Sequence, residues 1–213
     1  MNHLAPSLAQ GIAAMNLAIS DAQQQKLLHY LALLKKWNKT YNLTALRDES
    51  KMVSHHILDS LTLLPYTESA QTMIDVGSGG GMPGIPTAIC RPDLQILLLD
   101  ANTKKTTFLQ QAVIELGLKN VSVSSSRVEA LHGKTADIIT SRAFAELCDF
   151  VTLTRQLLHE NSHWVAMKGI YPSEEIARLP ENVEAYQIDQ LTMPTLDAER
   201  HMVLLRPTQG ATA

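Results

Sequence analysis

Five glycines within the eight positions 77–84 follow an aspartate, Asp75, and form the part of this chain best suited to chemistry. Glycine lacks a Cβ, so a glycine-rich turn lets a ligand approach the backbone closely. The segment, DVGSGGGMPGIP, starts inside an apolar run that predicts a strand. Ligands of open α/β sheets bind at the carboxyl ends of strands, so this turn is a candidate ligand site. The alternative is a tight strand-to-helix turn without a ligand.

Three nucleotide-binding patterns compete for this segment. A P-loop is excluded, because no Lys follows the last glycine. The dinucleotide pattern G-x-G-x-x-G matches from Gly79. An acid two residues before G-x-G-x-G, a pattern common in S-adenosylmethionine (SAM) methyltransferases, matches from Asp75. A carboxylate suits the amino group and sulfonium of SAM but would repel a pyrophosphate, so the sequence favours SAM.

Asp100 closes the next apolar run, QILLLD, near the offset expected for an acid that binds ribose. Its two oxygens could accept hydrogen bonds from both ribose hydroxyls. Alternatively, Asp100 caps the helix that is expected to start near Thr103. Asn102 or Thr103 could provide that cap instead, and we therefore expect Asp100 to contact ribose.

Apolar runs that alternate with helical patterns after Pro65 predict the elements that position these residues. The clearest helix is 104–116, which Gly117 is expected to end. This alternation favours βαβ units and a parallel sheet. The last two runs have no helix between them and predict an antiparallel pair at the edge. The seven expected strands are 72–76, 95–100, 121–125, 136–141, 163–168, 183–188 and 201–206.

Helices are expected before this sheet. Residues 20–37 form an amphipathic pattern, and Ser20 and Gln23 have the spacing of a capping box. Residues 51–64 predict a second helix, which Pro65 is expected to stop.

The composition limits the classes of function. The 213 residues fit one α/β domain, 66–213, after a helical extension, 1–65. No apolar run approaches the roughly 20 residues of a membrane span, and the N-terminus lacks a secretory pattern. Two cysteines are too few for a disulfide framework or a four-thiolate zinc site, so a cytoplasmic protein is expected. A net charge of −3 excludes nucleic-acid coating by bulk charge, so any such contact requires a local patch.

These segments together resemble one family. DVGSGGGMPGIP resembles the loop of the bacterial RsmG/GidB proteins, which are SAM-dependent methyltransferases acting on guanine N7 in 16S rRNA. KWNKTYNLTALRD is similar to a second family segment, and HILDSL, SRVE, SRAF, KG and ERH follow in order. The resemblance covers about residues 20–206. It implies a class I SAM-dependent methyltransferase fold, a Rossmann-like, mostly parallel seven-stranded sheet with an antiparallel last strand.

The resemblance also implies which residues bind the cofactor. It assigns SAM contacts to Gly77, Met82, Val128, Glu129 and Arg142, and the reasoning from residue types adds Asp75, Gly79 and Asp100. Met82 stands where the family usually has Leu or Phe, and a flexible apolar side chain suits the pocket.

The mechanism that the resemblance implies needs little from the protein beyond positioning. Guanine N7 carries a lone pair and no proton, so no general base is required. The catalytic residues are therefore left unassigned, with Arg142 and Lys168 as candidates near the reacting centre. No metal is expected, because His55 and His56 lack the spacing of helical metal ligands.

RNA contacts are expected mainly from the helical extension. The basic residues proposed for this role are Lys35, Lys36, Lys39, Arg47, His55, Lys168, Arg200 and His201. His55 stands where many family members have Arg, which makes a phosphate contact there weaker or pH-dependent. For the lysines, the alternative is a solvated helix end. The expected partner is 16S rRNA within a small-subunit particle or assembly intermediate, bound by a monomer without a membrane.

Two other functions compete with this one. A nicotinamide-dependent oxidoreductase would bind NAD(P) rather than SAM, and titration with both would separate the two. A non-catalytic module that binds rRNA or an assembly intermediate would keep the fold without transferring a methyl group.

Overall fold

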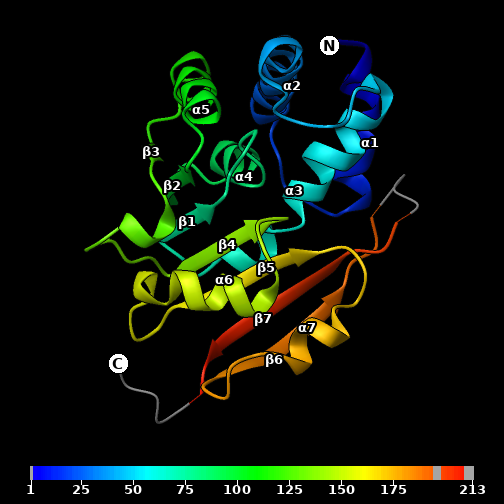
Figure 1. Cartoon of the computed structure of the whole chain (residues 1–213). Helices are drawn as coiled ribbons and strands as arrows, with labels where there is room; N and C mark the ends of the chain where they lie inside the picture. Colours follow the sequence, from blue (N-terminus) through cyan, green and yellow to red (C-terminus); the bar gives the residue numbers. More distant parts are fainter. Residues whose placement is uncertain (1, 194–197, 209–213) are drawn as a thin grey trace.

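The computed structural model describes residues 2–193 and 198–208, and its seven-stranded sheet has the order β3-β2-β1-β4-β5-β7-β6 (Figure 1). Neighbouring strands among β1 to β5 are parallel, whereas β7 is antiparallel to both β5 and β6. The order reverses between β1 and β4, where ligands of open α/β sheets bind. The strands are Thr72–Val76 (β1), Gln95–Asp100 (β2), Val121–Ser125 (β3), Ile138–Arg142 (β4), His163–Lys168 (β5), Val183–Gln190 (β6) and His201–Pro207 (β7).

The strand predictions are confirmed, with the limits of β4, β6 and β7 corrected. β1, β2, β3 and β5 match the predicted ranges, and β6 and β7 form the expected antiparallel pair. β6 and β7 end at Gln190 and Pro207 rather than at 188 and 206, and β4 ends at Arg142 rather than at 141. β4 also starts later than predicted, at Ile138 rather than at 136. The carboxylate of Asp137 explains the difference, because its Oδ2 accepts the amides of Gln71 and Thr72, each at 2.8 Å. Asp137 thus binds the start of β1 through its side chain, and the parallel pairing begins at the next residue.

Helices cover both faces of the sheet. Among the described residues the α-helices are Ala5–Ala14 (α1), Asp21–Tyr41 (α2), Asp59–Leu61 (α3), Gly84–Cys90 (α4), Thr103–Leu116 (α5), Leu147–Thr154 (α6) and Ser173–Ala177 (α7). Short 3-10 helices lie at Asn2–Leu4, Glu49–Lys51, Leu64–Thr67, Val128–Ala130 and Arg155–Leu157. The predicted capping box is confirmed, since Ser20 Oγ accepts the Gln23 amide and Gln23 Oε1 accepts the Ser20 amide. Gly117 ends α5 in the left-handed conformation, as predicted.

The predicted single helix at 51–64 is wrong in type and in its end. Val53–Leu58 is a π-helix, and α3 follows it directly. The carbonyl of His55 accepts a hydrogen bond from Arg142 on β4, so a tertiary contact uses backbone that a regular helix would need. Pro65 does not stop a helix. It lies in the first turn of the 3-10 helix Leu64–Thr67, where its missing N–H has no helical partner to lose.

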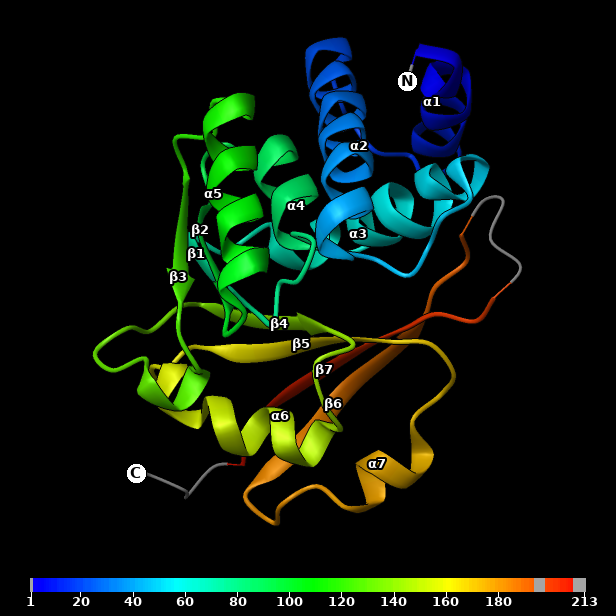
Figure 2. The ribbon, with the colours of Figure 1, turned by 45° about the horizontal axis from the view of Figure 1, so that its top comes forward.

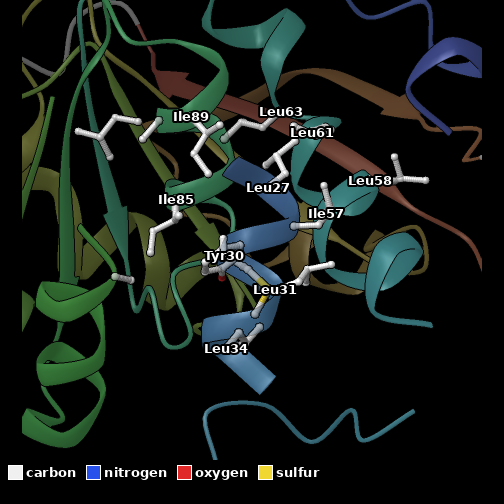
Figure 3. Close-up of a cluster of buried hydrophobic side chains, with 14 of the residues drawn as sticks. Leu27, Tyr30, Leu31, Leu34, Ile57, Leu58, Leu61, Leu63, Ile85 and Ile89 are labelled. Carbon is white, nitrogen blue, oxygen red and sulfur yellow. The ribbon is translucent and has the colours of Figure 1, made fainter. Parts of the chain in front are cut away.

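One apolar core joins the helical extension to the sheet. α1, α2 and α3 lie on the same side as α4 and α5, and α6 and α7 lie on the other (Figure 2). Leu27 and Leu31 of α2 belong to the same buried cluster as Ile57, Leu61 and, on α4, Ile85 (Figure 3). All five side chains are fully buried. The division at residue 65 stays a prediction, yet residues on both sides of it share a single core.

Candidate functional site

The glycine loop folds over the carboxyl end of β2. The amides of Gly77 and Ser78 both donate to the carbonyl of Leu99, at 2.8 and 3.0 Å. Gly77, Gly79 and Gly81 have φ angles of 71°, 57° and 91°, which disfavour residues with a side chain. The spacing of these three glycines in the sequence is therefore explained by three positions at which the backbone has a positive φ angle.

A cavity of about 340 Å³ lies beside this loop, at the carboxyl ends of β1 to β4, and is called here the glycine-loop cavity. Four residues predicted to bind SAM line it, namely Gly77, Asp100, Val128 and Glu129. The sequence reasoning missed other lining residues, including Ala101, Lys105, Ser126, Arg127, Ala143 and Phe144. All of these follow a predicted strand closely, and that position was the signal available for finding them.

Asp100 fixes the loop as well as lining the cavity. Its Oδ2 accepts the Gly79 amide at 2.9 Å, and its Oδ1 accepts the Asn102 amide at 2.8 Å. Asn102, not Asp100, caps α5, because its side chain accepts the Lys104 amide at 3.0 Å. A carboxylate oxygen has two acceptor sites, so each oxygen of Asp100 can still accept one hydroxyl.

Asp75 lies beneath the loop and lines neither cavity described here. Its side chain is fully buried, and Oδ2 accepts the Gly84 amide at the start of α4, at 3.1 Å. Oδ1 has no hydrogen-bond partner among the described residues. Burial raises the pKa of Asp75 to about 7. This position suits support of the loop rather than the direct contact with SAM that the sequence suggested.

Two loop glycines differ in the space around them. A Cβ on Gly77 would lie 2.6 Å from the ring of Phe144, which lines the same cavity. A Cβ on Gly79 would meet nothing closer than the Gly77 carbonyl oxygen at 3.8 Å. Gly77 therefore allows the Phe144 ring to close on the loop, whereas a Cβ on Gly79 would make only an ordinary van der Waals contact.

A second cavity, of about 530 Å³, adjoins the first and is called here the arginine cavity. Ala143 lines both cavities, and its φ of 57° is unusual for a residue with a Cβ. The arginine cavity is lined by Leu46, His55, His56, Asp59, Arg142, Ala143, Met167, Lys168, Gly169 and Arg200. Arg142, predicted to contact SAM, thus lines the arginine cavity. Its neighbour in sequence, Ala143, lines both cavities.

Asp59 joins three distant chain segments at this cavity. Its Oδ2 lies 2.7 Å from Arg142 Nη1 on β4, and its Oδ1 lies 2.6 Å from Arg200 Nε just before β7. The Asp59 side chain is 5% exposed, so the bridge is buried on the carboxylate side. The sequence reasoning missed this role, although Asp59 belongs to the HILDSL segment that it singled out.

Met82 and Lys168 are both engaged by neighbouring groups. Met82 is buried, and its Sδ accepts from Arg142 Nη2 at 3.2 Å, so it orients the arginine and does not line the glycine-loop cavity. Lys168 Nζ lies 2.6 Å from Glu175 Oε2 and donates to the Ala145 carbonyl at 3.1 Å.

His56 brings a neutral imidazole to the arginine cavity. Burial lowers the pKa of His56 to about 4, and the nearby Arg142 charge adds to the effect. His56 Nε2 lies 3.1 Å from Thr44 Oγ1. Arg142, Arg200 and Lys168 face the carboxylates of Asp59 and Glu175, so cations exceed anions by one in this group. Such a wall suits an anionic or electron-rich ligand.

The remaining residues predicted to bind RNA lie in three places, namely α2, the segment that follows α2, and β7. Lys35, Lys36 and Lys39 are exposed on α2 and line neither cavity, and Lys35 pairs with Glu49. Arg47 donates to Asn42 Oδ1 at 2.7 Å. His201 is buried, with Nδ1 2.8 Å from the Gly169 carbonyl, so little of its side chain faces solvent.

The two aromatic residues near the C-terminus of α2 are partly buried against the core. Trp37 and Tyr41 stack with ring centroids 5.2 Å apart, and both pack against the apolar cluster. The exposed face of α2 near its C-terminus therefore offers charge rather than stacking surfaces.

The described part of the chain contains no group of three or more His, Cys, Asp or Glu side chains able to hold a metal ion. None of its helices is both long and apolar enough to cross a membrane.

Comparison with known proteins shows the family of the chain. Residues 23–203 match the family described as rRNA small subunit methyltransferase G. The chain belongs to this family. A relative of that name from Neisseria meningitidis serogroup B is 67% identical over 198 residues, covering 93% of this chain and 96% of the relative. Relatives from Chromobacterium violaceum and Laribacter hongkongensis are 58% and 55% identical, covering 92% and 95% of this chain and 94% and 98% of theirs.

Solved structures support the fold. TrmN from Thermus thermophilus superposes with a TM-score of 0.57 at 15% identity, over 80% of this chain and 53% of that one. The ribosomal protein L11 methylase of Lactobacillus delbrueckii gives 0.55 at 14% identity, over 71% and 78%. Coclaurine N-methyltransferase, solved with SAH, gives 0.56 at 9% identity, over 90% and 73%. The class I methyltransferase fold predicted from the sequence is confirmed.

Proposed function

We propose that this protein transfers the methyl group of SAM to N7 of a guanine in the 16S rRNA of the small ribosomal subunit. The observation that carries the proposal is the meeting of two chemically different cavities at Ala143. One is bounded by backbone and the Asp100 carboxylate, and the other by two arginines. Family membership supports the same reaction and does not favour a nicotinamide-dependent oxidoreductase.

The glycine-loop cavity fits SAM by the chemistry of its walls. Gly77 exposes backbone, and Asp100 and Glu129 offer carboxylate acceptors for hydroxyl groups. Val128 and Leu153 give apolar surface suited to a flat base. SAM supplies an electrophilic methyl group carried on a sulfonium. We propose that Gly79, Asp75 and Met82 act behind this surface, by fixing the loop, the start of α4 and Arg142.

The arginine cavity fits the acceptor base. N7 of guanine needs no general base, and the buried His56 with its lowered pKa is not required as one. The guanidinium groups of Arg142 and Arg200 can donate to guanine O6 or to a phosphate oxygen. Asp59 holds both groups in place and offsets part of their charge. Lys168 lies at the same wall and completes the proposed positioning set.

The lysines of α2 serve the approach of RNA rather than the reaction. Lys35, Lys36, Lys39 and Arg47 lie outside the cavities' charged wall, so we propose that they contact phosphates of the surrounding rRNA. A ribosomal substrate implies action in the cytoplasm. We propose a monomer that acts on a small-subunit particle or assembly intermediate.

The test is to map N7-methylguanine in 16S rRNA from cells with and without the gene. One modified guanine is expected to disappear on deletion and to return with the wild-type gene. Arg142→Ala should fail to restore it, whereas Arg206→Ala, at an exposed pair with Glu184 on the β6–β7 hairpin, should restore it. Purified protein that binds small-subunit RNA but transfers no label from SAM would instead identify a non-catalytic binding module.

A further inference from the structure

Two exposed apolar side chains stand next to the arginine cavity. Ile170 is 76% exposed and Tyr171 is 51% exposed, and they directly follow Lys168 and Gly169, which line the cavity. Figure 2 shows this segment leaving the end of β5 and looping toward α7. Among the described residues, the other large apolar side chains with such exposure are Ile114 and Tyr186, and neither adjoins the other or a cavity described above.

The buried ring of His201 supports the Tyr171 ring. The two rings meet edge to face, with centroids 5.6 Å apart and an interplanar angle of 87°. His201 is itself fixed by the Gly169 carbonyl, 2.8 Å from its Nδ1. A supported aromatic ring loses little freedom when it stacks on a ligand, so this exposed residue is suited to binding.

A base that enters the arginine cavity must leave its stack. Enzymes that act on a base inside structured nucleic acid extrude it, and unstacking costs a few kcal/mol. The neighbouring base then loses a stacking partner. Proteins that bind unpaired RNA offer aromatic faces to such bases.

We propose that Tyr171 and Ile170 form a stacking site for the nucleobase next to the target guanine. The proposal rests on the proposed function, because it assumes that guanine occupies the arginine cavity. Lys168 and Arg200 flank that cavity and carry charge suited to the phosphate that joins the two nucleotides. His201, which the sequence assigned to RNA, acts through Tyr171 as a positioning residue.

Methyl transfer to small subunits from cells that lack the gene tests this site. Tyr171→Ala should lower kcat/KM for the subunit by about 5- to 150-fold, the effect of losing one stacked base. Tyr171→Phe keeps the ring and should stay close to wild type, and Ile170→Ser should show a smaller loss than Tyr171→Ala. SAM affinity by calorimetry and the melting temperature should not change. If Tyr171→Ala methylates subunits as well as the wild type does, the stacking site is refuted.

Matched controls come from exposed residues at the amino ends of the strands, away from the carboxyl ends where the cavities lie. Ile114→Ser alters an equally exposed isoleucine on the last turn of α5, and Tyr186→Ala alters a tyrosine whose ring meets His163 at the start of β5. Both should leave kcat/KM unchanged. A loss equal to that of Tyr171→Ala would show a general effect of surface change and would overturn the proposal.

Photo-crosslinking identifies what covers the site. With p-benzoylphenylalanine in place of Tyr171, irradiation on the subunit should crosslink to 16S rRNA beside the methylated guanine. A crosslink to a ribosomal protein, or to distant RNA, would overturn the proposal while leaving the methyl-transfer function intact. A wild-type protein that transfers no methyl group would instead refute the proposed function, so the two failures are distinguishable.

Discussion

The glycine-loop cavity and the arginine cavity share Ala143 but are lined by different chemical groups. The glycine-loop cavity is bounded by backbone at the ends of neighbouring strands. The hydrogen bond that fixes its loop joins Gly79 to Asp100, which lie 21 residues apart in the sequence. The arginine cavity is held by charged side chains, with Asp59 and Arg200 separated by 141 residues. Backbone turns can be encoded by a short motif, whereas a bridge of three charges depends on the whole fold.

This difference predicts how each cavity fails when it is damaged. Loss of a charge from the arginine cavity leaves its buried partners uncompensated, so stability and substrate use should fall together. Loss of a ligand-facing group from the glycine-loop cavity should lower cofactor affinity while the fold persists. The following predictions run from the largest expected effect to the smallest.

Asp59→Ala should give the largest effect, because it leaves Arg142 and Arg200 without their shared carboxylate. Removing one member of a buried ion pair costs about 3–5 kcal/mol of unfolding free energy, measured by urea denaturation. Glu184→Ala, which removes the exposed partner of Arg206, should cost less than about 1 kcal/mol. Equal stability of the two variants would show that the arginine cavity does not depend on the bridge.

The titration of Asp75 should make the free energy of unfolding depend on pH. Burial raises its folded pKa from 3.8 to about 7, so between these values the folded protein binds the extra proton and the unfolded chain does not. Wild-type stability should therefore fall as pH rises from 4 to about 8, relative to Asp75→Asn, by on the order of 3 kcal/mol. Denaturation curves at several pH values measure this difference. A constant difference would mean that Asp75 keeps an ordinary pKa.

Asp100→Ala should weaken SAM binding while the protein stays folded. The carboxylate faces the glycine-loop cavity and also fixes Gly79, so its loss should cost roughly 1–3 kcal/mol, about 5- to 150-fold in affinity by calorimetry. Asp93→Ala, at a carboxylate paired with Arg91 outside both cavities, is the control and should bind SAM normally. Unchanged affinity in Asp100→Ala would remove Asp100 from the proposed cofactor site.

Lys36→Glu combined with Lys39→Glu should have the smallest effect on the protein itself. Both lysines are exposed and line neither cavity, so SAM affinity and stability should stay as in the wild type. Loss of two phosphate contacts should reduce the salt dependence of RNA binding by about two units of slope.

The control for the lysine pair is Lys119→Glu with Lys134→Glu, which changes two exposed lysines near the amino ends of β3 and β4. That variant should keep the wild-type slope. Equal slopes in all three proteins would show that the α2 lysines are a solvated helix end. A fall in SAM affinity for the α2 variant would show that α2 and the glycine loop act as one unit, consistent with the hydrogen bond from Tyr30 to Gly80.

The sequence by itself determined what depends on neighbours along the chain. The period of apolar residues gave four strands with their correct limits, and the capping box and Gly117 gave two helix ends. The glycine loop was recognised because a turn involves residues a few positions apart, and Asp100 because it closes the next apolar run at the offset expected for an acid that binds ribose. Val128 and Glu129 were assigned through the resemblance of the SRVE segment to the family, and both line the glycine-loop cavity.

Tertiary structure alone decided the rest, because contacts between distant segments have no local signature. It turned the expected helix at 51–64 into a π-helix against Arg142, and it placed Asp75 under the loop instead of in the cavity. It also buried His201 behind Tyr171. Above all, it brought Asp59, Arg142 and Arg200 together, since pairing of buried charges is set by which elements the fold makes adjacent.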